Sequence, residues 1–195
     1  MTHNIPIPCS KTIQYYLDEW GKLEKYALQE RALNYLFSQA CPSNKDIAHV
    51  ILKVSTLNDF YSTNIYDTFS VSRHIVSIKN FHDRLKRGDP SLVNDVAKVR
   101  IKEKEINFYS FASKYCSHHS PSYFPIYDSY VEKMLWHYKQ ATEFKIFKKY
   151  ELKNYNVFLD TIHCFQHFFD LKKFSLRDID IFLWLAGKKY FPNKY

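Results

Sequence analysis

Glycine is scarce in this sequence, since its 195 residues include only three. Rossmann and P-loop folds bind phosphate through glycine-rich turns, so the composition excludes both architectures. The four cysteines, Cys9, Cys41, Cys116 and Cys164, lie far apart and form no C-x-x-C pair. They are therefore expected to be reduced thiols, and they support neither a disulfide framework nor a zinc site.

Long apolar runs are also missing. No stretch approaches the roughly 18 apolar residues that a membrane span requires, and the N-terminus has no charged-then-apolar signal sequence. These absences predict a cytoplasmic protein without a membrane partner. The chain length predicts one domain or two closely packed lobes with a buried core.

Aromatic residues and positive charge are abundant. Phe, Trp and Tyr make up 18% of the chain, and 28 basic residues against 20 acidic ones give a net charge of +8. A tyrosine combines a flat stacking face with a polar tip, and excess positive charge favours a polyanionic partner such as nucleic acid. Charge that serves solubility alone is the alternative.

Apolar residues recur at spacings of three and four along most of the chain, which is the pattern of one face of an α-helix. No alternating strands or Asn-Gly hairpins stand out, so the sequence predicts the all-α class. Helices are predicted over residues 10–41 (broken or bent at Gly21), 43–54, 71–87, 90–99, 108–117, 129–135, 155–169 and 176–187. Expected N-caps are Ser10, Ser43, Ser129 and Ser175, and expected helix ends are Gly88 and Gly187.

Residues 107–135 form the most informative stretch, and they predict a helix, a loop and a second helix. Lys114 lies on the polar face of the first helix, between Ser110 and Ser117. Two prolines hold the loop extended, and the second helix begins at Asp128 or Ser129. Lys114 and Asp128 are thus two ionisable groups on consecutive helices, separated by one short loop.

The run Pro125-Ile126-Tyr127-Asp128-Ser129-Tyr130-Val131 resembles the P-[IV]-x-D-[ST]-x-V segment of the helix-hairpin-helix DNA glycosylases, the superfamily of endonuclease III and the 8-oxoguanine DNA glycosylases. The resemblance implies a two-lobed helical DNA glycosylase-like fold over 1–195, with a cleft between the lobes. One lobe would span roughly 43–130 with a catalytic segment at 107–135, and the N- and C-terminal helices would form the other. The glycine hairpin of that family is replaced here by residues 101–106.

The resemblance also implies chemistry. Asp128 would be the catalytic carboxylate that stabilises positive charge on the sugar, and Lys114 would be a nucleophile that forms a Schiff base. The expected activity is excision of a modified or damaged base from double-stranded DNA by a monomer without a cofactor, with or without AP lyase activity, in repair or anti-phage defence. The alternative interpretations are that Asp128 is only a helix N-cap and Lys114 an ordinary solvated lysine.

Two further groups of residues are candidates for binding DNA. Asn58, Tyr61, Asn64 and His118 would line a base pocket, because amides read base edges and a tyrosine ring stacks on them; a polar helix junction is the alternative. Lys98, Arg100, Lys102 and Lys104 would bind the DNA backbone, unless they form a solvated turn. His163 and His167 lack a third ligand, so no metal site is expected.

The sequence is also compatible with two functions other than a DNA glycosylase. A catalytically inactive DNA-binding module of the same fold would keep the DNA-facing surface without the chemistry. A helical protein-interaction domain would use its charge only for solubility.

Overall fold

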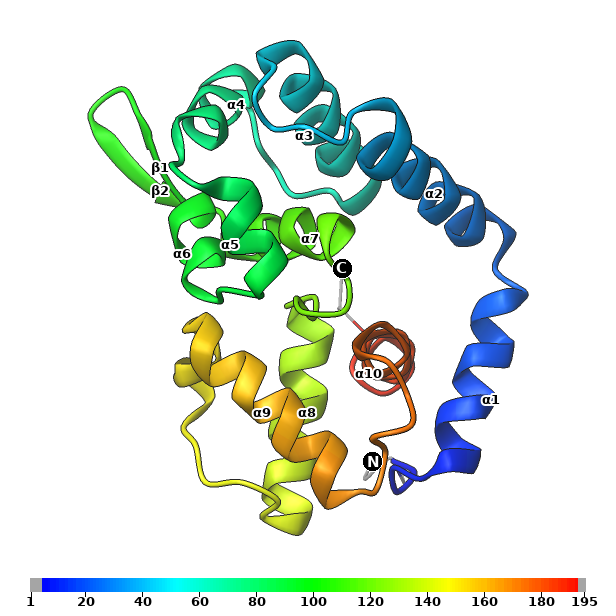
Figure 1. Cartoon of the computed structure of the whole chain (residues 1–195). Coiled ribbons are helices and arrows are strands. Elements are labelled where there is room, and N and C mark those ends of the chain that lie inside the picture. The colour runs from blue at the N-terminus through cyan, green and yellow to red at the C-terminus, as the bar shows by residue number, and fades with distance from the viewer. Residues whose placement is uncertain (1–4, 193–195) are drawn as a thin grey trace. The chain divides into compact units, whose positions relative to one another are not determined.

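The computed structural model describes residues 5–192 and is mostly helical (Figure 1), which confirms the helical class predicted from periodicity. The chain divides into two compact units. The first unit comprises Met1–Glu24 and Tyr127–Tyr195, and the second comprises Lys25–Ile126. Across the described residues, no helix combines the length and apolarity that crossing a membrane requires.

The second unit is organised around one buried helix. Its elements are α2 (Glu24–Tyr35), a π-helical turn (Leu36–Ala40), α3 (Ile47–Tyr61), α4 (Thr68–Ser77), α5 (Phe81–Arg87), α6 (Ser91–Ala97), β1 (Lys98–Ile101), β2 (Lys104–Asn107) and α7 (Tyr109–His119). Helix α7 packs against α3, α6 and the π-helical turn. Every residue of α7 from Phe111 to Ser117 is buried, so its polar residues lie inside the unit rather than on a solvated face.

A β-hairpin occurs where the sequence predicted no strand. Strands β1 and β2 pair antiparallel, with Val99 opposite Ile106 and Arg100 opposite Glu105 (Figure 1). The prediction failed because each strand is only four residues long and the turn contains no glycine. Instead Lys102 adopts the left-handed conformation at φ 55° that such a turn requires.

The first unit has its own aromatic core. It contains α1 (Ser10–Gly21), α8 (Ser129–Thr142), a 3-10 turn (Lys149–Lys153), α9 (Tyr155–Phe168) and α10 (Leu176–Tyr190). Helix α10 packs against both α1 and α8. Gly187 does not end α10 as predicted. It lies within the helix, where a Cβ would be only 2.6 Å from the Cβ of Tyr130 on α8. Glycine is therefore needed at this position because α10 and α8 approach each other closely.

The helix boundaries correct several predictions. The N-cap of α3 is Asp46, whose Oδ1 accepts from the Ala48 amide, rather than Ser43. Residues 71–87 form two helices, because Asn80 in the left-handed conformation separates α4 from α5. Cys9 rather than Ser10 precedes α1. The caps at Ser175 and Gly88 are confirmed.

Candidate functional site

Lys114 is a buried lysine in the middle of α7. Only 3% of its surface is exposed, and Nζ donates to Ser110 Oγ at 2.5 Å, one turn earlier in the same helix. The ammonium group also lies 5.3 Å from the centre of the Tyr61 ring. The interpretation of Lys114 as an ordinary solvated lysine is therefore wrong, because its side chain is buried, and lysines are seldom buried unless they are paired.

Tyr61 and His118 belong to the same arrangement. The hydroxyl of Tyr61, the last residue of α3, is hydrogen-bonded to His118 Nε2 at 3.0 Å. His118 is one helical turn after Lys114, so both side chains emerge on the same face of α7. Two of the predicted pocket residues, Tyr61 and His118, thus lie beside the predicted nucleophile, and we call Tyr61, Ser110, Lys114 and His118 the Lys114 cluster.

Asn58 and Asn64 do not join that cluster. The Asn58 amide holds the α3–α4 loop: its Oδ1 accepts from the Ile65 amide at 2.8 Å and from Thr63 Oγ1 at 2.9 Å, and its Nδ2 donates to the Ile65 carbonyl. Asn64 is exposed and left-handed at φ 57°. Both residues fit the alternative of a polar helix junction. The side-chain oxygen of Asn58 already accepts two hydrogen bonds within the protein, so it is not available to read a base edge.

Asp128 is the N-cap of α8 in the first unit. Its Oδ1 accepts a hydrogen bond from the Tyr130 amide at 2.9 Å, and the residue is half-buried. Ser129, the other expected cap, is the first residue of the helix instead. The carboxylate thus lies at the N-terminus of α8, where the partial positive charge of the helix stabilises a negative charge.

The four predicted backbone-binding cations lie on the hairpin of the second unit, and all four are exposed. The strand register places Lys98 and Arg100 on one face, and Lys104 on the other, opposite Ile101. Lys102 forms the turn. The hairpin therefore carries cations on both faces and at its tip, with Glu105 beside Arg100 on one of the faces.

A second buried lysine was missed in the sequence. Lys53, on α3, has no exposed surface, and its Nζ lies within hydrogen-bonding distance of three acceptors: Asn44 Oδ1 at 2.6 Å, the Ser43 carbonyl at 3.0 Å and His119 Nε2 at 3.2 Å. The only sequence signal is its place in the apolar stripe of Val50, Val54 and Leu57. A lysine on the buried face of a helix marks a buried polar site.

The neighbours of Lys53 complete a hydrogen-bonded network, which we call the Lys53 cluster. The Tyr115 hydroxyl donates to Asn44 Oδ1 at 2.5 Å, and His82 Nε2 accepts from the Asn44 backbone amide at 3.1 Å. Burial, and then the charge of Lys53, lower the pKa values of both His82 and His119. Neutral imidazoles with free Nε2 lone pairs are the forms that can accept these hydrogen bonds.

Burial also lowers the pKa of Lys53 to about 8, from a usual value of 10.5. No carboxylate lies within ion-pair distance of its ammonium group among residues 5–192. A lysine with a lowered pKa holds a useful fraction of neutral amine near neutral pH, which is a property of nucleophilic lysines. The side chain of Lys53 is completely buried, however, which favours a structural role over a nucleophilic one. Its hydrogen bonds connect α3 to α7 and to the loop at Asn44.

The stability of the protein should rise with pH because of Lys53. The unfolded lysine has the higher pKa, so between pH 8 and pH 10.5 the unfolded chain binds more protons than the folded chain. Each pH unit in that window contributes about 1.36 kcal/mol, and the whole window about 3 kcal/mol. Lys53→Met should lose this rise, whereas the exposed Lys45→Met should keep it.

Urea unfolding between about pH 7.5 and pH 9.5 measures this effect and stays below the range in which tyrosines ionise. The rise expected in this range is about 2 kcal/mol, seen as the difference between wild type and Lys53→Met. Identical pH profiles for the two proteins would show that Lys53 is fully charged in the folded state.

The described residues include no group of three or more His, Cys, Asp or Glu side chains that could hold a metal ion. His163 and His167 are both exposed on α9. The second unit contains two lysine clusters on adjacent faces of α7, one at Lys114–His118 and one at Tyr115–His119, and the rings of His118 and His119 both contact Phe37.

Comparison with known proteins places the chain in a family. The HI_0787_N family, described as an N-terminal domain, matches residues 12–123. An uncharacterized protein from Haemophilus influenzae (strain KW20 / Rd) is 44% identical over 147 residues, which cover 75% of this chain and 70% of that protein. No solved structure matches. The chain belongs to the HI_0787_N family, and the matched segment contains both lysine clusters and the hairpin but ends before Asp128.

Proposed function

We propose that this protein is a DNA glycosylase that removes a modified or damaged base from double-stranded DNA. The observation that carries the proposal is the burial of Lys114 with its amine held between Ser110 and the Tyr61 ring. The resemblance of residues 125–131 to the helix-hairpin-helix glycosylases adds Asp128 as the second reacting group. In this proposal the two compact units correspond to the two lobes of such an enzyme.

Asp128 stabilises the positive charge that develops on the sugar when the N-glycosidic bond breaks. The departing base takes the bonding electron pair, and an ionised carboxylate lowers the free energy of the resulting oxocarbenium-like state. The Tyr130 amide, at the N-terminus of α8, fixes the orientation of the carboxylate. A side chain that is already oriented needs no reorganisation during the reaction.

Lys114 acts as the nucleophile in the lyase step. Its neutral amine forms a bond with C1′ as the base leaves, and ring opening yields a protonated Schiff base. Elimination of the 3′ phosphate from that intermediate then cleaves the strand. The amine must lose its proton before it attacks, and Ser110 Oγ, which accepts a hydrogen bond from Nζ, holds the nitrogen in place.

The residues around Lys114 suit an extruded base. A base has to leave the duplex stack before the enzyme can reach its glycosidic bond, and aromatic side chains stabilise it outside the stack. Tyr61 provides a ring and His118 a hydrogen-bonding edge beside the amine. The exposed cations of the hairpin supply charge for phosphate contacts that do not depend on sequence.

A catalytically inactive DNA-binding module is the second candidate. The observation in its favour is the hairpin itself, which replaces the glycine hairpin of the glycosylases with two charged strands. Such a module would keep salt-dependent affinity for DNA and release no base.

Mass spectrometry of released bases tests the proposal. The protein is incubated with duplex DNA carrying oxidised, alkylated, deaminated or phage-type modified bases, and free bases are quantified. We expect release from one of these classes, and release from phage-type DNA alone would indicate defence rather than repair. Salt-sensitive binding without any release would favour the inactive module, and the absence of both would favour a protein-interaction domain.

A further inference from the structure

Tyr66 is an exposed tyrosine on a rigidly held loop between α3 and α4. Its side chain is 97% exposed, whereas the preceding Ile65 is buried with 3% exposure. Asn58 fixes Ile65 through both its backbone groups. On the other side, Asp67 caps α4 by accepting from the amide and the hydroxyl of Ser70. The backbone on both sides of Tyr66 is therefore anchored while its ring contacts solvent.

A second exposed aromatic ring lies nearby on α4. Phe69 is 53% exposed, and the guanidinium carbon of Arg73 is 5.9 Å from the centre of its ring. Two large aromatic rings three residues apart at a helix start are unusual on a solvated surface, because each exposes apolar area to water. A flat ligand that covers this apolar area would therefore bind favourably.

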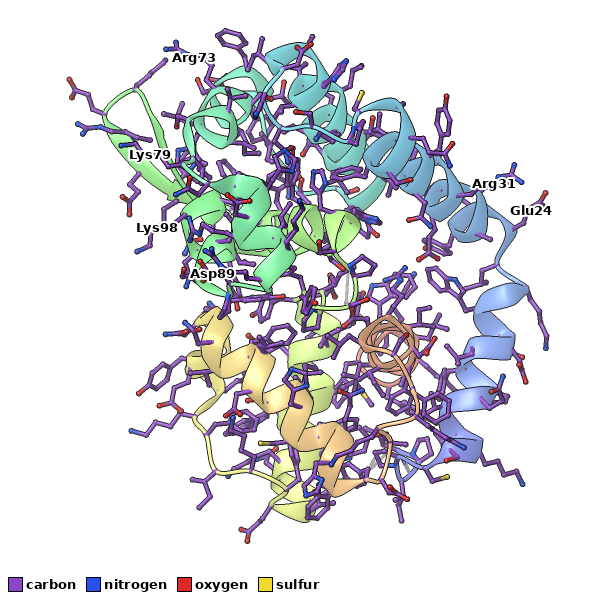
Figure 2. The ribbon with its side chains drawn as sticks, viewed as in Figure 1. Glu24, Arg31, Arg73, Lys79, Asp89 and Lys98 are labelled. Atoms are coloured by element: carbon purple, nitrogen blue, oxygen red, sulfur yellow. The ribbon has the colours of Figure 1, made fainter. Side chains whose placement is uncertain are left out.

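The surroundings of these rings are positively charged. Helix α4 packs against β1, and Figure 2 shows Arg73, Lys79 and Lys98 on the side of the second unit from which the hairpin projects. The two hydrogen bonds from Ser70 lower the pKa of Asp67, and the charge of Lys102 adds a smaller contribution in the same direction.

These cations are available to a ligand. Arg73, Lys79 and the four hairpin cations are exposed, and none has an acidic partner within 4.0 Å in the described part of the chain. Within residues 66–79 and 98–107 the acidic residues are Asp67, Glu103 and Glu105, so the six cations exceed them by three, and the neighbouring Asp95 is paired with Arg84. Lysine is depleted at protein–protein interfaces, so a surface this rich in lysine fits a polyanion better than a protein.

We propose that Tyr66, Phe69 and Arg73, together with the cations of the hairpin, form a binding surface for single-stranded nucleic acid. Bases stack on the exposed rings, and the phosphates follow the lysines and arginines beside them. Asn58 is a positioning residue for this surface, because its amide holds the loop that presents Tyr66. The proposal stands apart from the glycosylase activity, since it requires neither Lys114 nor Asp128.

Fluorescence anisotropy with a labelled oligothymidylate of about 12 nucleotides tests the surface. Tyr66→Ala should weaken binding by about tenfold, because stacking of one base contributes roughly that factor. Tyr66→Trp should retain the affinity. The matched control is Tyr35→Ala, which removes another exposed tyrosine, 58% exposed on α2 of the same unit, and should bind like wild type.

Salt dependence and strand form separate the two parts of the proposal. Lys102→Ala should reduce the slope of log affinity against log salt by about one, whereas Tyr66→Ala should leave the slope unchanged. A blunt duplex of the same length can contact the hairpin cations through its phosphates but offers no unstacked base, so its affinity should be insensitive to Tyr66→Ala. Equal affinities of Tyr66→Ala and Tyr35→Ala for the oligothymidylate, or an equal loss of duplex affinity in Tyr66→Ala, would overturn the proposal. Asp128→Asn should bind the oligonucleotide normally, so a failure of base release leaves this test unaffected.

Discussion

Asp128→Asn is expected to lower the rate of base release by about a thousandfold while leaving the protein folded. The substitution removes the negative charge that stabilises the developing cation, and losses of a hundred- to a thousandfold are typical for one such electrostatic contact. Asparagine is as good an N-cap as aspartate, and its side-chain oxygen can still accept from the Tyr130 amide. The loss of activity should therefore occur without a loss of stability.

The chain offers a closely matched control. Asp46 caps α3 with the same geometry, since its Oδ1 accepts from the amide two residues later at 2.8 Å. Asp46→Asn removes one N-cap charge as well and should release base at the wild-type rate. Single-turnover release by both variants, together with their urea unfolding curves, measures the effect. Equal rates for the two variants would remove Asp128 from the mechanism.

Lys114→Met is expected to abolish the covalent complex that borohydride traps between the protein and DNA. A Schiff base requires a primary amine at the reacting carbon, and methionine keeps the length and apolar stem of lysine without the amine. The stem of Lys114 is buried in α7, so this variant preserves most of the packing. Ser110 Oγ loses one partner, which costs about 1 kcal/mol of stability.

Lys53→Met is the informative comparison for Lys114→Met. Both lysines are buried in the second unit, but Lys53 already has three hydrogen-bond acceptors around its ammonium group. Lys53→Met should therefore still be trapped on DNA, as judged by gel shift and peptide mapping of the adduct. Trapping of Lys114→Met but not of Lys53→Met would move the nucleophile to Lys53, and no trapping of wild type would contradict a lyase step.

Helices with a strong apolar stripe were predictable from the sequence. The segments at α7, α9 and α10 were each predicted from spacings of three and four, and the structure confirms them with small shifts at their ends. The cap at Ser175 was predictable because its partner, Asp178, lies three residues away. Such features depend on interactions within about one helical turn.

The prediction of helix and strand boundaries failed at two positions where a residue other than glycine adopts a left-handed backbone conformation. Asn80 and Lys102 both adopt the left-handed conformation without being glycine. The first interrupts a continuous apolar pattern between α4 and α5, and the second closes the hairpin. Asparagine is tolerated in this conformation but also occurs in many others, so neither residue identifies the position of the turn in the sequence.

The sequence by itself determined the helical class, the positive charge and the placement of Lys114 and Asp128 on consecutive helices. Only the tertiary structure decided that Lys114 is buried beside Tyr61 and that Asn58 holds a loop. It also revealed the Lys53 cluster, in which Asn44 contacts His119 across 75 positions of the chain. Helix formation depends on near neighbours, whereas the environment of a side chain depends on partners that only the folded chain brings together.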